Sequence, residues 1–99
     1  MKARLSPIRG LVLDKGLYPR RSMDQKLVVT YAEAIRHGAK FPPITVGTVG
    51  GKHVVIDGWH RLHAYKKLGQ ANVLSTELGA ITGTQALAQA VRLNAISGR

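Results

Sequence analysis

The segment from Val54 to Gly69 constrains the fold more than any other, because a buried strand passes directly into a helix there. The strand is predicted from three consecutive apolar β-branched residues: Val54, Val55 and Ile56. The helix is predicted from apolar residues at helical spacing: Leu62, Tyr65 and Leu68. Gly69 follows at the position where a left-handed residue usually ends a helix. The chain therefore contains a strand–turn–helix unit with Asp57-Gly58 as its turn.

This turn has the chemistry of an anion site. A strand that enters a helix through Gly58 leaves the first N–H groups of the helix pointing toward one position. The helix dipole favours a negative charge at that position. Arg61 adds a fixed positive charge, and His60 adds a group that titrates near neutral pH. We therefore interpret residues 57–61 as a phosphate-binding turn.

The same residues carry a family resemblance. The sequence Asp57-Gly58-Trp59-His60-Arg61 resembles the signature of the ParB/sulfiredoxin superfamily. Partition proteins of that superfamily have Gly-Glu-Arg-Arg here, sulfiredoxins have Gly-Gly-Cys-His-Arg, and free-serine kinases have the most similar form, Asp-Gly-x-His-Arg. The resemblance covers about residues 18–78. It implies an α+β domain of the ParB/sulfiredoxin type, with a small mixed sheet and three helices.

The resemblance also implies ligands and the residues that would bind them. The expected ligands are a nucleoside triphosphate and Mg²⁺. The residues expected to bind the nucleotide are Gly58, Trp59, His60, Arg61, Arg20 and Arg21. Arg20 and Arg21 are included because an arginine-containing segment near this place lines the nucleotide pocket of ParB relatives. Asp57 is the expected metal ligand, and Asp57 and His60 are the candidate catalytic residues.

Each of these side chains has a structural alternative. Asp57 would also suit the N-cap of the following helix, where its carboxylate would accept from the backbone of Trp59 or His60. Arg61 would alternatively be an exposed arginine in a solvated ion pair. Trp59 would either stack on a base or fill the core. A zinc site formed by His53, His60 and His63 is disfavoured, because no carboxylate or cysteine completes a known spacing.

The absence of cysteine excludes one activity of the superfamily. Trp59 occupies the position of the sulfiredoxin nucleophile, and the chain has no cysteine at all, so it is not a sulfiredoxin. The glutamate of ParB is also replaced at Trp59. Nucleoside triphosphate hydrolysis and phosphoryl transfer stay open as activities, with Asp57 as the placed carboxylate and Glu33 and Glu77 unplaced.

Charge is the second strong signal in the sequence. Fifteen lysines and arginines against five acidic residues give a net charge of +10. Such a balance on 99 residues favours a nucleic-acid partner, although solubility or a basic tail would also explain it. No apolar run is long enough for a membrane helix. We expect a cytoplasmic domain without membrane contact, and a homodimer is compatible with the sequence.

The remaining elements are predicted from local signals. Residues 1–99 form one domain, in which residues 1–7 are a loose basic arm and residues 8–13 a first short strand. Ser22 and Gln25 form a capping box that opens a helix ending at Gly38. Residues 44–49 form a strand that enters a hairpin through Gly50-Gly51. Residues 72–78 form a further strand.

The C-terminal segment is predicted to be helical. Thr82 and Gln85 form a second capping box, and the last helix has Leu87, Ala90 and Val91 on its apolar face. In ParB relatives a helix at this place leads into a DNA-binding region. Residues 82–99 are therefore expected to be a C-terminal helix, which either connects to such a region or belongs to a free-standing domain.

Three functional hypotheses follow from these observations. The first is a ParB-like domain that binds nucleotide phosphates at residues 57–61 and serves DNA partition or regulation. The second is a nucleic-acid-binding module without nucleotide activity, which the high charge favours. The third is a phosphotransferase related to free-serine kinases, which the form of the turn favours.

Overall fold

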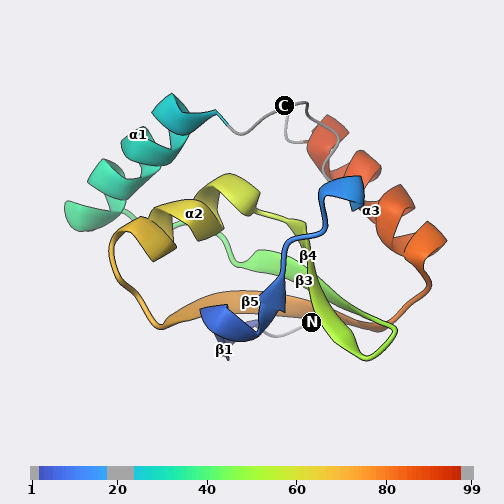
Figure 1. Ribbon diagram of the computed structural model, residues 1–99. Coiled ribbons are helices and arrows are strands. Elements are labelled where there is room, and N and C mark those ends of the chain that lie inside the picture. Colours follow the sequence, from blue (N-terminus) through green and yellow to red (C-terminus); the bar gives the residue numbers. More distant parts are fainter. Residues whose placement is uncertain (1–2, 18–23, 97–99) are drawn as a thin grey trace.

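The computed structural model describes residues 3–17 and 24–96 of the 99-residue chain. One five-stranded mixed sheet is combined with three α-helices in these residues (Figure 1). The strands are β1 (Ala3–Pro7), β2 (Leu11–Val12), β3 (Ile44–Val49), β4 (Lys52–Asp57) and β5 (Asn72–Ala80). The helices are α1 (Gln25–Arg36), α2 (Trp59–Lys67) and α3 (Gly83–Ile96), with short 3₁₀ turns η1 (Ile8–Gly10) and η2 (Lys15–Leu17). The predicted α+β architecture is confirmed.

The strands lie in the order β1-β5-β3-β4-β2. β3 and β4 form the predicted antiparallel hairpin, whose turn residues Gly50 and Gly51 have φ angles of 57° and 82°. Two consecutive left-handed residues give the turn that matches strand twist, which explains the glycine pair. β5 pairs with β3 in parallel and β2 pairs with β4 in parallel, whereas β1 is antiparallel to β5.

β4 is buried from both sides, and this explains its run of β-branched residues. Val55 faces the cluster that contains Trp59 and Leu62 of α2. Val54 and Ile56 face the cluster that contains the α3 alanines. The helices α2 and α3 thus lie on opposite sides of β4 (Figure 1). The strand that leads into the turn at residues 57–58 is therefore packed on both of its faces.

α1 packs on α2 rather than on the sheet. Val28 and Ala32 of α1 form a buried cluster with Ala64 of α2. In Figure 1, α1 lies beyond α2 as seen from the strands. No helix in the described part of the chain is long and apolar enough to cross a membrane.

Two predictions for the N-terminal region are wrong. Residues 3–7 of the supposed basic arm form β1, which pairs with β5 in a register that places Leu5 opposite Leu74. Residues 8–13 are not one strand, because η1 precedes the two-residue strand β2. The partner of β1 is about 70 residues away in sequence, so no local sequence signal predicts this strand.

The cap of the first helix was also predicted wrongly. The helix begins at Gln25, and its N-cap is Asp24, whose Oδ1 accepts from the N–H of Leu27 at 3.2 Å. Gln25 is therefore the first helical residue and not the third, which a capping box requires. Ser22 lies outside the described residues.

The C-terminal helix has its predicted start but only part of its predicted apolar face. The N–H of Thr82 donates to Oε1 of Gln85 at 2.9 Å, and the N–H of Gln85 donates to Oγ1 of Thr82 at 3.0 Å, which confirms the capping box. Leu87 and Val91 are 44% and 51% exposed. Ala90 is buried against the sheet as predicted, together with Ala86, because their small side chains allow the helix to approach β4 closely.

Candidate functional site

The turn between β4 and α2 requires glycine for two reasons. Gly58 is the N-cap of α2 and has a φ of 104°, which L side chains rarely adopt. A Cβ at this position would also lie 2.6 Å from Cγ2 of Ile44 and 2.9 Å from its Cβ. The first bond of the helix runs from the N–H of Leu62 to the carbonyl of Gly58, at 2.8 Å. The N–H groups of residues 59–61 therefore precede the helical ladder.

Asp57 is not the N-cap, because Gly58 has that position. The Asp57 carboxylate lies beside the helix and accepts from Nη2 of Arg61 at 3.1 Å through Oδ2. The cap interpretation of Asp57 is therefore wrong. Its observed partner is the cation of the same turn.

Arg61 is held at three points. Its Nη1 donates to the carbonyls of Pro42 and Pro43 at 2.7 and 3.1 Å, and its Nη2 donates to Asp57. The side chains of Arg61 and Asp57 are only 16% and 19% exposed, so the alternative of a solvated surface pair is also wrong. The guanidinium connects the segment before β3 to the turn after β4. It is a fixed charge next to Gly58, since Nη2 lies 3.2 Å from where a Gly58 Cβ would be.

The side chains of Trp59 and His60 are both buried. The Trp59 ring belongs to the core cluster on the α2 side, and its Nε1 donates to the carbonyl of Val55 at 3.3 Å. Nε2 of His60 accepts from the N–H of Asp24 at 3.2 Å, which places the proton of a neutral ring on Nδ1. His60 thus connects the start of α2 to the start of α1. Arg20 and Arg21 lie outside the described residues.

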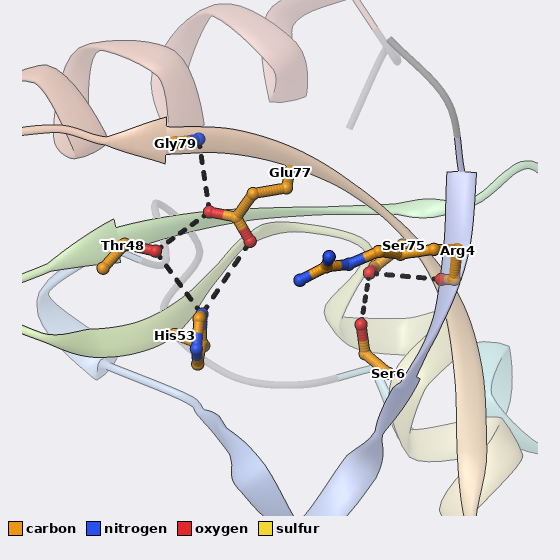
Figure 2. A network of polar contacts seen from close by, with 7 residues as sticks. All are labelled: Arg4, Ser6, Thr48, His53, Ser75, Glu77 and Gly79. Carbon is orange, nitrogen blue, oxygen red and sulfur yellow. Dashed lines mark hydrogen bonds and ion pairs between the residues drawn. The ribbon is translucent and has the colours of Figure 1, made fainter.

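A second polar cluster, missed in the sequence, lies on the sheet near the β3–β4 hairpin (Figure 2). Oε2 of Glu77 accepts from Oγ1 of Thr48 at 3.0 Å and from the N–H of Gly79 at 3.2 Å. Nδ1 of His53 lies 3.8 Å from Oε1 of Glu77, and Figure 2 shows the Arg4 side chain pointing toward this carboxylate. These residues are brought together by strand register, which explains why sequence spacing gave no signal.

This cluster and the turn are at opposite ends of β4, so Glu77 and His53 do not contribute to the turn. The other unplaced carboxylate, Glu33, lies on the surface of α1 and pairs with Arg36 at 3.3 Å. No group of three or more His, Cys, Asp or Glu within the described residues could hold a metal ion.

His63 has a lowered pKa, because it is partly buried and because the positive charge of Lys66 is close to it.

The fold and the glycine turn together define an α+β domain of the ParB/sulfiredoxin type. The model of the ParB N-terminal domain family matches residues 6–95, and the chain belongs to that family. No curated protein matches the chain in sequence.

Solved structures give the same fold. The C-terminally truncated chromosome-partitioning protein ParB from Caulobacter crescentus, complexed with CTP-gamma-S, has a TM-score of 0.82 at 21% identity and covers 95% of this chain and 53% of its own. The chain thus spans about half of that relative. The same partition protein complexed to the centromeric parS site has a TM-score of 0.69 at 19% identity, covering 89% and 44%.

Two other classes of protein share the fold. Sulfiredoxin from Arabidopsis thaliana has a TM-score of 0.72 at 25% identity and covers 93% of this chain and 99% of its own. A free serine kinase mutant in complex with AMP has a TM-score of 0.63 at 20% identity, covering 77% and 30%. The three relatives differ in function, so the fold by itself does not select one activity for this chain.

Proposed function

We propose that residues 57–61 bind the phosphates of a nucleotide in a domain that also associates with DNA. The observation that carries the proposal is the left-handed Gly58 at the N-cap of α2. A residue without a side chain lets a phosphate approach the backbone N–H groups at the helix end. Support also comes from the complexes of similar folds, one with CTP-gamma-S and one with AMP.

Arg61 would supply the fixed positive charge of the site. Its guanidinium is already positioned by the carbonyls of Pro42 and Pro43, so little side-chain entropy is lost when a ligand binds. Because Trp59 and His60 have buried side chains, their contribution to the ligand is assigned to their backbone. The contact between His60 and Asp24 gives the His60 ring a positioning role at this site.

Asp57 is the group that would contact a metal ion. A single carboxylate is sufficient for Mg²⁺ when nucleotide phosphates and water supply the other ligands, so the residues present fit this ion. The ion would neutralise phosphate charge during hydrolysis or transfer. The role of Asp57 would then be to hold the ion or to accept a proton.

The proposal is tested by adding millimolar nucleotide to isotope-labelled protein, with and without Mg²⁺. The amide resonances of residues 58–61 should shift and saturate, since these N–H groups would contact the phosphates. Arg61→Ala should weaken binding by about 1.5–3 kcal/mol, the range for a hydrogen bond to a charged group. Arg36→Ala is the control, because it removes the same charge from the surface of α1. Unchanged resonances at every nucleotide concentration would refute the site.

The role of Asp57 is tested separately with Asp57→Asn. The amide can still accept from Arg61, so the fold and metal-free nucleotide binding should persist. Turnover that depends on Mg²⁺ should be lost if Asp57 holds the ion or accepts a proton. Turnover equal to that of the parent protein would exclude both roles.

A second candidate is a nucleic-acid-binding module in which the turn is only a scaffold. It is favoured by the three bonds that already engage Arg61 within the protein. This candidate predicts salt-dependent DNA binding, no response of residues 58–61 to nucleotide, and loss of stability in Arg61→Ala. The nucleotide titration separates it from the first candidate.

A further inference from the structure

A groove lies at the end of α2 that is opposite the turn. Its volume is about 740 Å³. The lining residues come from η1 and its neighbours and from the loop after α2: Pro7, Ile8, Arg9, Leu11, Lys66, Gly69, Gln70, Ala71 and Asn72. The nine residues of α2 place this groove about 13 Å from residue 59 along the helix axis. The groove is therefore separate from the candidate nucleotide site.

The walls of the groove are fixed by backbone contacts. The N–H of Ile8 donates to the carbonyl of Ala71 at 2.9 Å. This hydrogen bond joins η1 to the loop after α2, the two segments that line the groove. Gly69 has a φ of 77° and turns the chain from α2 toward β5. The Ile8 side chain is buried in the core. The fold thus fixes the backbone on both sides of the groove.

The charge in the groove has one sign. Arg9 and Lys66 line it and are exposed. Neither forms an ion pair with another described residue. All five acidic residues of the chain are described, and none lines the groove. Gln70 and Asn72 add neutral amide donors at the rim. This composition suits an anionic ligand that is long enough to contact both cations.

We propose that the groove binds the backbone phosphates of a nucleic-acid strand through Arg9 and Lys66. The net charge of +10 attracts a polyanion over long range, and the groove is the proposed site of contact. Among the described residues, no aromatic side chain lines the groove, so base stacking is not expected to contribute and binding should be independent of base sequence. This inference rests on the DNA association in the proposed function and locates it.

The first experiment measures binding to duplex DNA over a range of salt concentrations. The test variant is Arg9→Gln with Lys66→Gln. The control variant is Lys26→Gln with Lys52→Gln, which removes the same charge from exposed sites outside the groove. All four side chains are exposed, so neither variant should affect folding.

At 0.1 M salt, the test variant should lose affinity by about eightfold for each phosphate contact that it removes. The reason is that each contact makes log K fall by about 0.9 for a tenfold rise in salt concentration. The slope of log K against log salt should therefore decrease by about 1.8 for two contacts. The control variant should stay close to the parent in both quantities. Equal losses in the two variants would mean diffuse attraction, and would overturn the assignment to the groove.

An acidic peptide is the competing occupant. A polyglutamate peptide that binds the parent protein more tightly than DNA does, and is lost in the test variant, would also overturn the proposal. The nucleotide response of residues 58–61 should be the same in the test variant and the parent. A failure of the nucleotide site and a failure of the groove are thus seen in different measurements.

The second experiment uses His63 as a reporter. Burial lowers the pKa of His63, and the nearby charge of Lys66 lowers it further. A phosphate bound at Lys66 would offset that charge and raise the pKa of His63. The ring resonances of His63 should therefore titrate at higher pH with saturating DNA, and this difference should vanish in Lys66→Gln. An unchanged His63 titration with DNA bound would place the phosphates elsewhere.

Discussion

At the scale of single residues, Gly58 has a left-handed backbone, and Ile44 occupies the space where a Cβ of residue 58 would lie. Gly58→Ala should lower the free energy of unfolding by about 2–4 kcal/mol, from left-handed strain together with overpacking. Gly69→Ala is the matched control, since Gly69 is also left-handed but has open space where a Cβ would lie. It should cost about 1–2 kcal/mol. Urea denaturation of both variants measures the difference, and equal losses would contradict the packing argument.

His63 makes stability depend on pH. Its folded-state pKa is lowered by burial first and by Lys66 second, so the unfolded chain binds the proton more readily. The stability associated with the neutral ring is fully present above the unfolded pKa of about 6.5, and is lost as the pH falls from that value through the lowered pKa of the folded state. His63→Gln should therefore show a smaller loss of stability than the parent between pH 7.5 and 5.5, the range chosen for urea denaturation. An identical pH dependence in both proteins would contradict the assignment.

At the scale of elements, the capping box at the start of α3 is a local device with a local effect. Thr82→Ala removes the acceptor for the N–H of Gln85 and should destabilise the protein by about 1 kcal/mol. Thr84→Ala is the control within the same helix, where alanine is the better helix former. Thermal unfolding should show a lower Tm for Thr82→Ala than for Thr84→Ala, and the reverse order would exclude the cap.

The packing of α3 depends on its small residues. Ala86 is fully buried against β4, so Ala86→Leu should overpack this contact and cost about 1–3 kcal/mol. Leu87→Ala on the exposed face should change stability by less than about 0.5 kcal/mol. Chemical denaturation compares the two. A large loss in Leu87→Ala with little in Ala86→Leu would mean that the other face of α3 is buried.

At the scale of the molecule, the chain carries fifteen basic residues against five acidic ones, and its radius of gyration is 12.8 Å. The mutual repulsion of the basic residues opposes the compact state, and salt screens it. Raising NaCl from 20 to 300 mM should therefore stabilise the fold by about 1 kcal/mol, or about 4–8 °C in Tm for a domain of this size. Calorimetry at the two salt concentrations measures the shift. A fall in Tm with salt would mean that ion pairs outweigh the repulsion.

Features with local causes could be predicted from the sequence alone. A run of β-branched residues predicted β4, a glycine pair predicted the hairpin turn, and Gly69 predicted the end of α2. The second capping box was visible for the same reason, because Thr82 and Gln85 meet within one helical turn. The resemblance at residues 57–61 rests on the same local unit. Backbone sterics and short-range hydrogen bonds act over a few residues, so they can be read in order along the chain.

Features that depend on partners far away in the sequence could not be predicted and were seen only in the folded structure. β1 forms because β5 offers it a strand edge. Glu77 on β5 meets His53 on β4 because β3 lies between these two strands and pairs with both. The same holds for Arg61, whose guanidinium was predicted to face a ligand but is held by Pro42 and Pro43. These contacts arise from strand register and from packing between elements. Strand register and packing between elements do not produce a periodicity or a residue spacing that can be recognised in a single sequence.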